Sequence, residues 1–381
     1  MKATNIDWMP FIPDNWKVVR LKDIAKLQSG NGITSDDIDE LGDYPVYGGN
    51  GLRGYTTSYT NEGDYVLIGR QGALCGNINY AHGKFYASEH AVVVYTHIKT
   101  ENNTWLGETL RMANFNRLSA SAAQPGLAVG VLNFQMIPYP PEEIRNKIGN
   151  YLEDKLGKID HRLAVLEKEN VAYARLKKSV IYQAVTHGLN AKVPLKDSCI
   201  DWIGMIPEHW CMVHLKNCVT INNGKDYKDI ETDEGIPVIG SGGQFAYASE
   251  CMYDGEVVFM GRKGTIDRPL YFNGAFWAVD TMFYAIPFNN CSGKFLYYCA
   301  TCFPYHRIST ATALPSMTQR DLYQLPVALP SLSEQQAIAA YLDEKCAKID
   351  AAIENISKQI EASKRLKKAV INEAIGGKIQ M

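Results

Sequence analysis

Residues 142–187 read EEIRNKIGNYLEDKLGKIDHRLAVLEKENVAYARLKKSVIYQAVTH. Apolar side chains recur in this stretch at alternating steps of three and four residues, which is typical of the narrow seam of a coiled coil. They are Ile148, Leu152, Leu156, Ile159, Leu163, Leu166, Tyr173, Leu176, Val180 and Ala184. Pro140 and Pro141 precede the stretch and Gly188 follows it, as at helix boundaries. At about 1.5 Å per residue, we predict a rod roughly 65 to 70 Å long, whose single apolar seam needs a partner.

The chain contains its own partner segment, residues 333–377. A constant shift of 190 residues aligns the two segments, so that KID at 158–160 matches KID at 348–350 and RLKK at 175–178 matches RLKK at 365–368. Chance does not keep one register over such a length, so we predict that the two segments are long helices that pack together.

The predicted core of this helix pair draws on both segments. Its members are Leu152, Leu156, Ile159, Leu163 and Leu166 from the first, and Leu342, Cys346, Ile349, Ile353 and Ile356 from the second. Further along the second segment, Leu366 continues the seam in the position that Leu176 has in the first. Ser333, with Gln336 three residues later, predicts a capping box that starts the second helix.

The helices are half of a longer repeat. The pattern Trp-x-x-x-Ile-Pro-x-x-Trp occurs at residues 8–16 and again at 202–210, and residues 63–72 match 255–264. We therefore predict four parts: globular unit 1–141, long helix 142–190, globular unit 191–329 and long helix 330–381. Short apolar runs bounded by glycine predict mostly β units, with strands near 65–69, 91–95, 256–261 and 281–286 and short helices near 105–112 and 294–302. The expected fold class is α+β with an internal pseudo-two-fold repeat.

Composition limits the possible classes of protein. The 381 residues carry a formal net charge of −2, which argues against a general polyanion binder. It does not argue against a protein that reads DNA through local patches of charge. The nine cysteines are odd in number and show no disulfide pattern, so a reducing cytoplasm is the expected location. The sequence shows no signal peptide and no membrane-spanning run.

Motifs of catalysis and cofactor binding are missing from the sequence. There is no phosphate-binding loop, no metal-binding His-Glu helix, no nucleophile elbow and no Asn/Asp-Pro-Pro-aromatic tetrapeptide. Residues 49–54 match Gly-x-Gly-x-x-Gly, but a β-type sequence follows where a nucleotide site needs a helix. Cys299 and Cys302 have metal-like spacing without a second pair, so buried thiols are expected. We predict a protein that is not an enzyme and holds no metal.

Two matched loops are the best candidates for contacts with DNA. Gly69-Arg70-Gln71-Gly72 and Gly261-Arg262-Lys263-Gly264 each follow a predicted strand. Arginine can grip guanine or a phosphate, glutamine suits adenine, and flanking glycines let the backbone approach closely. The alternative is that Arg70 and Arg262 are structural ion-pair formers, because both copies contain them.

Residues shared by both copies suit scaffold or phosphate roles, whereas residues that differ are better candidates for reading different bases. Pairs that differ include Gln71 with Lys263, Asn77 with Pro269, and Gln124 with Leu314. The candidate DNA-binding residues are Asn50, Arg53, Arg70, Gln71, Asn77, Ser119, Ser121, Gln124, Gln244, Arg262, Lys263, Arg268, Arg307 and Thr310.

The order of these parts resembles the specificity subunit of type I restriction-modification systems. The repeated tryptophan entry and PSLSEQQAI at 330–338, which opens the closing helix, carry the resemblance over the whole chain. The first junction departs from this form, because residues 142–148 read EEIRNKI where the second copy has Glu-Gln-x-x-Ile.

The resemblance implies two target recognition domains, each of which reads one half of a split double-stranded DNA site. It also implies two helices packed antiparallel as a spacer, and docking of two methyltransferase (M) subunits and two restriction (R) subunits. S-adenosylmethionine and ATP would then belong to those partners, with no cofactor in this chain. The alternative is a coiled-coil scaffold whose β domains bind proteins or glycans.

Overall fold

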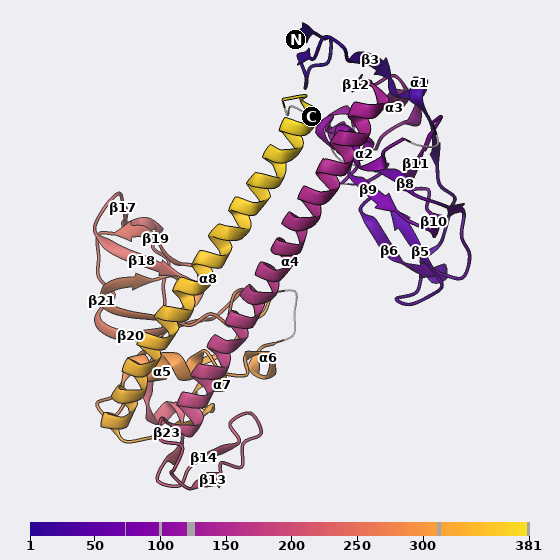
Figure 1. The fold of residues 1–381 in the computed structure, drawn as a ribbon. Coiled ribbons are helices and arrows are strands. Elements are labelled where there is room, and N and C mark those ends of the chain that lie inside the picture. The colour runs from indigo at the N-terminus through magenta and orange to yellow at the C-terminus, as the bar shows by residue number, and fades with distance from the viewer. Residues whose placement is uncertain (73, 99–100, 120–125, 311–313, 379–381) are drawn as a thin grey trace. The chain divides into compact units, whose positions relative to one another are not determined.

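The computed structural model describes residues 1–381 except 73, 99–100, 120–125, 311–313 and 379–381 (Figure 1). The chain divides into two compact units, which we call unit 1 (Met1–Glu167 with Lys358–Met381) and unit 2 (Lys168–Ser357). Each unit holds one globular domain together with part of helix α4 (Glu142–His187) and part of helix α8 (Leu332–Ile375).

The globular domain of unit 1 is built mainly from two four-stranded sheets, with strand orders β6-β5-β10-β7 and β4-β11-β8-β9. Its strands are β1 (Lys2–Ala3), β2 (Phe11–Ile12), β3 (Lys17–Arg20), β4 (Ala25–Ser29), β5 (Tyr44–Gly48), β6 (Gly51–Thr56), β7 (Asn61–Glu62), β8 (Tyr65–Gly69), β9 (Ile78–Ala81), β10 (Lys84–Ala87), β11 (Ala91–Thr96) and β12 (Met136–Tyr139). Its helices are α1 (Leu21–Ile24), α2 (Asn103–Met112) and α3 (Val129–Asn133).

The globular domain of unit 2 repeats this plan around a seven-stranded sheet of order β16-β22-β20-β21-β18-β19-β17. Its strands are β13 (Leu195–Asp197), β14 (Met205–Pro207), β15 (Cys211–His214), β16 (Val219–Asn223), β17 (Glu231–Thr232), β18 (Ile236–Gly240), β19 (Gly243–Ala248), β20 (Tyr253–Gly261), β21 (Leu270–Ala278), β22 (Met282–Pro287) and β23 (Pro326–Leu329). Its helices are α5 (Gly293–Ala300), α6 (Tyr305–Ile308) and α7 (Gln319–Tyr323).

The two domains share their strand pairing. Both contain one parallel pair within an otherwise antiparallel arrangement, β5 with β10 in unit 1 and β18 with β21 in unit 2. The long strand β21 corresponds to β9 and β10, which the turn at His82 and Gly83 separates. This difference explains why unit 1 has two smaller sheets where unit 2 has one. The expected α+β fold with two similar, mostly β domains is confirmed.

The ends of the long helices follow from local sequence. Helix α4 begins directly after Pro141, and both helices end before a glycine with positive φ, Gly188 at +72° and Gly377 at +67°. The predicted capping box at Ser333 is wrong, because helix α8 begins at Leu332. Ser331 caps it instead, since its Oγ accepts a hydrogen bond from the Glu334 N–H at 3.4 Å. Ser331 is the N-cap because it follows a proline and because its hydroxyl accepts from the Glu334 N–H, which has no acceptor within the helix.

The two helices run antiparallel within each unit, as two matched ion pairs show. In unit 2 the Lys177 ammonium lies 2.6 Å from Asp350 Oδ2, and in unit 1 the Lys367 ammonium lies 2.6 Å from Asp160 Oδ1. The shift of 190 residues converts one pair into the other. The same register therefore recurs in both units.

The predicted seam is confirmed for most of its length. Of its predicted members, Leu163 and Ile353 are half-buried, and the other eight are buried. These eight are Leu152, Leu156, Ile159, Leu166, Leu342, Cys346, Ile349 and Ile356. The prediction is wrong further along, where Tyr173, Leu176 and Leu366 are 37%, 47% and 52% exposed. The polar residue Lys177 faces the partner helix there, so the line of contact passes one residue beyond the apolar leucine.

The outer ends of the helices belong to the domain cores. In unit 1, Ile148 and Leu152 of α4 and Ile375 of α8 pack in one apolar cluster with the buried Trp105. In unit 2, Leu342 and Cys346 of α8 join a corresponding cluster with Trp210, Phe295 and Ile181. Burial of such side chains is worth about 1.5 to 3 kcal/mol each, so every domain is fixed to the helix pair by its own core.

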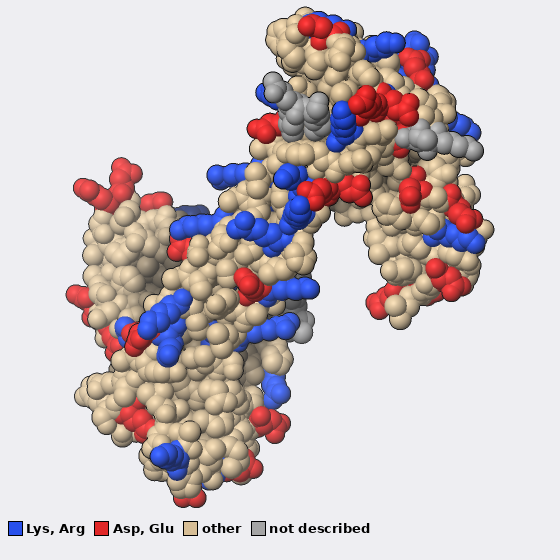
Figure 2. Space-filling model, in the orientation of Figure 1, with Lys and Arg blue, Asp and Glu red and all other residues tan. Residues whose placement is uncertain are grey.

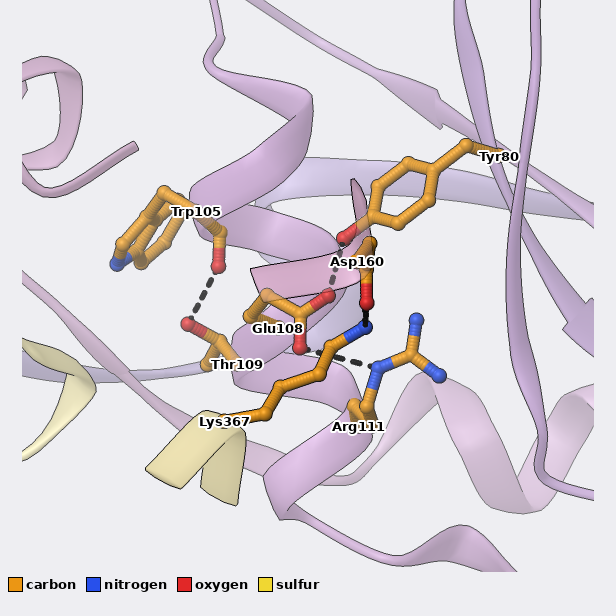
Figure 3. Close-up of polar contacts among 7 residues, drawn as sticks. All are labelled: Tyr80, Trp105, Glu108, Thr109, Arg111, Asp160 and Lys367. Carbon is orange, nitrogen blue, oxygen red and sulfur yellow. Dashed lines mark hydrogen bonds and ion pairs between the residues drawn. The ribbon is translucent and has the colours of Figure 1, made fainter. Parts of the chain in front are cut away.

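A buried carboxylate links helix α2 to strand β9 in unit 1 (Figure 3). The Glu108 side chain accepts a hydrogen bond from Tyr80 Oη at 2.9 Å and from Arg111 Nε at 3.0 Å. Burial and the nearby carboxylate raise the pKa of Tyr80. The tyrosine therefore stays a neutral donor, and the cluster holds the domain together rather than transferring protons.

Candidate nucleic-acid interface

Three segments meet in unit 1, namely the turn after strand β5, the loop after strand β8, and the segment before helix α3 that holds Ser119 and Gly126. The turn at Gly49 lies against the loop after β8, where a Cβ on Gly69 would stand only 2.2 Å from the Gly49 carbonyl oxygen. Asn77 Nδ2 donates to Asn50 Oδ1 at 3.2 Å between the same two loops. The third segment joins through Gln71, which forms a β-bridge with Gly126. We call these residues, with Arg70, His90 and Ser119, the unit 1 loop cluster.

Unit 2 contains the matching cluster, made from the loop after strand β20 and the segment between helices α6 and α7 that holds Thr310 and Ser316. Lys263 forms a β-bridge with Ser316, as Gln71 does with Gly126. The Thr310 hydroxyl lies 2.7 Å from Ser316 Oγ within the segment that Ser316 joins to Lys263. We call these residues, with Arg262 and Thr281, the unit 2 loop cluster.

The backbone of the two clusters is the same. The Arg70 N–H donates to the His90 carbonyl and the Arg262 N–H to the Thr281 carbonyl, both at 2.8 Å. The Arg70 carbonyl accepts from Leu127, and the Arg262 carbonyl accepts from Met317, at 2.8 and 3.0 Å. One scaffold of main-chain hydrogen bonds therefore presents two different sets of side chains.

The side chains on that scaffold differ in chemistry. Unit 1 presents the amides of Asn50, Gln71 and Asn77, and the Asn79 Nδ2 beside them is buried without a hydrogen-bond partner in the described chain. Unit 2 has Gly242, Lys263, Pro269 and Tyr271 at the matched positions. Amides can both donate and accept hydrogen bonds at a base edge, whereas lysine only donates.

The structural ion pairs expected under the alternative for Arg70 and Arg262 are not observed among the described residues. Within the described residues, neither Arg70 nor Arg262 forms an ion pair. Arg262 Nη1 donates to the Asp280 carbonyl at 3.3 Å and its guanidinium lies 6.0 Å from the Phe283 ring centre. Both guanidinium groups thus keep hydrogen-bonding capacity for an outside acceptor.

The structure brings together most, but not all, of the predicted candidates. Asn50, Arg70, Gln71, Asn77 and Ser119 share the unit 1 cluster, where Ser119 Oγ accepts from the Gly126 N–H at 3.1 Å. Arg262, Lys263 and Thr310 share the unit 2 cluster, Arg268 is exposed on the same loop as Lys263, and Gln244 is exposed on strand β19. Arg307 is exposed on α6, and Ser121 and Gln124 lie outside the described residues.

One feature of hairpins β5–β6 and β18–β19 is not predicted by the sequence. In hairpin β5–β6, Val46 pairs with Gly54 and Tyr47 with Leu52, so Arg53 is the extra residue of a β-bulge. In hairpin β18–β19, Val238 pairs with Ala246 and Ile239 with Gln244, so Phe245 is the extra residue. Alignment of the two copies places Arg53 opposite Phe245, but only the strand register shows that both are bulged.

The remaining motifs have structural roles. Residues 49–54 form a turn and the start of strand β6, as expected for a glycine-rich turn. Cys299 is buried on α5, and burial holds the pKa of its thiol well above the usual value and also raises the pKa of the Cys302 thiol. In the part of the chain that the structure describes, no group of three or more His, Cys, Asp or Glu residues could hold a metal ion. Among the same residues, no helix is long and apolar enough to cross a membrane.

Comparison with known proteins gives a consistent result. A family model described as "Type I restriction modification DNA specificity domain" matches residues 13–167 and 207–362. The type I restriction enzyme EcoprrI specificity subunit of Escherichia coli is 37% identical over 165 residues, which are 42% of this chain and 41% of that protein. A putative type I specificity subunit of Mycoplasma pneumoniae is 25% identical over 338 residues, 86% of this chain and 88% of that one.

Solved structures share the fold. A chain from a structure of the type I R-M system aligns with a TM-score of 0.67 at 17% identity, covering 97% of this chain and 100% of the other. The S subunit of a type I restriction-modification system from M. genitalium aligns with a TM-score of 0.55 at 14% identity, covering 98% of each chain. The two family matches coincide with the two halves of the internal repeat. This chain belongs to the family of type I restriction-modification DNA specificity proteins.

Proposed function

We infer that this chain is the DNA specificity subunit of a type I restriction-modification complex, in which each globular domain reads one half of a bipartite DNA target. The observation that supports this inference is the pair of loop clusters, with one shared backbone and different side chains at matched positions. Contacts to phosphates fix position and can be common to both clusters, whereas contacts to base edges must differ if the half-sites differ. Family membership leaves the alternative of a protein- or glycan-binding scaffold without support.

The shared arginines are the proposed phosphate contacts. Replacing Arg70 or Arg262 with Ala removes one cation near the backbone of the duplex. We expect each variant complex to bind specific and non-specific DNA roughly tenfold more weakly, and the slope of log K against log salt to fall by about one. Titration of labelled duplexes at several salt concentrations measures both quantities.

A matched control for this test is Lys17→Ala, which removes an exposed cation from strand β3 of unit 1. This control should leave the salt slope unchanged. If Arg70→Ala weakened binding only to the specific site and kept the slope, Arg70 would contact a base rather than a phosphate, and the assignment would be wrong.

The outer faces of the helices are the proposed docking surfaces for methyltransferase subunits. Leu176 and Leu366, which the 190-residue shift matches, are exposed among the basic residues of the two RLKK segments. Lys and Arg side chains gather over α4 and α8 on the face drawn in Figure 2. In unit 2 a groove of about 240 Å³ is lined by Ser179, Val180, Gln183, Ala184, Gly188, Leu189 and Tyr341. Exposed apolar side chains with a charged rim are typical of protein interfaces.

Because the two faces match, one methyltransferase subunit should be lost for each face that is damaged. We expect Leu176→Asp or Leu366→Asp to reduce the number of bound methyltransferase subunits from two to one, and the double variant to bind none. Native mass spectrometry of the co-purified complex counts the subunits. Val131→Asp, which changes a residue 44% exposed on α3, is the matched control and should retain both. A double variant that still carried two subunits would contradict this assignment.

Catalysis is proposed to reside in the partners. S-adenosylmethionine and ATP would bind to the methyltransferase and restriction subunits, two of each, while this chain selects the DNA. The near-zero net charge of the chain agrees with a reader that relies on local patches and on partner subunits for general affinity.

A further inference from the structure

The bulges in hairpins β5–β6 and β18–β19 are equivalent. Each bulge follows the turn of its hairpin, at the third residue of β6 or β19, and leaves that residue without a cross-strand partner. A β-bulge bends its strand and re-aims the side chain of the extra residue, and such bulges are frequent beside functional sites. The same β-bulge therefore directs one side chain in each unit, Arg53 in unit 1 and Phe245 in unit 2.

The side chain of the bulge residue packs on an equivalent glycine in both units. The stem of Arg53 lies on Gly48, where a Cβ would stand 2.4 Å from Arg53 Cδ. The ring of Phe245 lies on Gly240, where a Cβ would stand 3.1 Å from Cε1. Glycine at this position leaves room for whichever side chain the bulge carries. The glycine is the same in both units and the bulge residue differs, as expected of a position that sets specificity.

Neither Arg53 nor Phe245 has a structural role within the described part of the chain. Among the described residues, the Arg53 guanidinium makes no ion pair and no side-chain hydrogen bond. Phe245 is 56% exposed, although Tyr227 steadies it by an edge contact with ring centres 5.4 Å apart at 89°. An exposed phenylalanine that contacts Tyr227 and Gly240 but belongs to neither apolar cluster has no role in the core of unit 2.

We propose that the bulge residue is the position at which the two domains read different bases: Arg53 reads guanine in one half-site, and Phe245 reads the methyl group of thymine in the other. Arginine forms two hydrogen bonds to the O6 and N7 of guanine, and an aromatic ring makes apolar contact with the thymine methyl. The proposal rests on the proposed function, because it assigns a base to one residue of each reading domain.

The test exchanges the two bulge residues, Arg53 and Phe245, in the full complex. Arg53→Phe and Phe245→Arg are each assembled with the partner subunits, and bound sequences are selected from a random duplex library and sequenced. Arg53→Phe is expected to lower the preference for guanine at one position of one half-site by roughly 10- to 100-fold, with the other half-site unchanged. Phe245→Arg is expected to replace thymine by guanine at one position of the other half-site.

Conservative and matched variants complete the experiment. Arg53→Lys keeps the charge but loses the planar fork, so it should also lose most of the guanine preference. Lys17→Phe and Phe288→Arg make the same kinds of change on β3 and on an exposed loop of unit 2, and should leave both half-sites as in the wild type.

The outcomes separate the two levels of the account. If the unchanged complex selects a bipartite site but both exchanges leave its sequence as it was, or weaken all sequences equally, the assignment of Arg53 and Phe245 is wrong. If the unchanged complex selects no bipartite site, the proposed function itself fails and this assignment fails with it.

Discussion

Lengthening both long helices by three matched heptads is expected to abolish binding to the natural target and to create binding to a target with a longer spacer. Both helices cross the boundary between the units, α4 after Glu167 and α8 after Ser357, and these points match under the 190-residue shift. Twenty-one added residues in each helix extend the pair by about 31 Å. That length corresponds to about nine base pairs at about 3.4 Å each, close to one turn of the duplex.

The expected loss on the original site is at least about 100-fold, because only one half-site can then be engaged at a time. Selection from a random library should return both original half-sites with a spacer longer by about nine base pairs. An insertion in α4 alone is the control, since it shifts the Lys177–Asp350 and Lys367–Asp160 pairs out of register. If the matched insertion kept the natural spacer, the helices would not set the separation.

Arg145→Ala is expected to cost unit 1 about 3 to 5 kcal/mol of folding free energy, because it leaves a buried carboxylate without its cation. Arg145 Nε lies 2.5 Å from Glu101 Oε1, and the two side chains are 3% and 2% exposed. The Arg145 Nη1 also donates to the Pro140 carbonyl at 2.6 Å, and the guanidinium lies 4.0 Å from the Tyr139 ring centre. Denaturant unfolding with hydrogen exchange assigns the loss to unit 1.

Unit 2 supplies a matched control for this prediction. Gln335, the counterpart of Arg145, donates through Nε2 to the Pro330 and Asn290 carbonyls at 3.0 Å and accepts from the Ser292 N–H at 2.9 Å. Gln335→Ala removes neutral hydrogen bonds only and should cost about 1 to 3 kcal/mol. Adding Glu101→Gln to Arg145→Ala should recover part of the loss. Equal losses for Arg145→Ala and Gln335→Ala would show that the buried charge has no special weight.

The large features of this fold follow from short-range patterns in the sequence. Pro141 and Gly188 bound helix α4 because proline suits the start of a helix and glycine can take positive φ at its end. The internal repeat gives the order of the parts, since two copies of one sequence pattern adopt one fold. The seam near Leu152 and Leu342 was predictable because burial in the domain cores agrees with the heptad spacing.

The errors arise where tertiary contacts decide between local alternatives. Leu176 and Leu366 continue the apolar spacing but lie outward, because the ion pairs of Lys177 and Lys367 occupy the line of contact. Ser333 fits a capping box as well as Ser331 does, and only the true start of α8 distinguishes them.

The candidate site was predictable as a set of loops but not as a geometry. The shared Gly-Arg-x-Gly segments marked the right loops, and the structure brings Asn77 to Asn50 across them. The bulges at Arg53 and Phe245 depend on which residues pair across the hairpin, and the spacing within one strand does not contain that information.

The central claim, that each domain reads its own half-site, is tested most directly by disabling one loop cluster. The variant Arg70→Ala/Gln71→Ala/Asn77→Ala changes only the unit 1 cluster and leaves the unit 2 cluster intact. Selection from a random duplex library by the assembled complex should return the half-site of unit 2 unchanged, at its normal sequence, with no preference in the other half. A motif that changed in both halves, or in neither, would contradict the account.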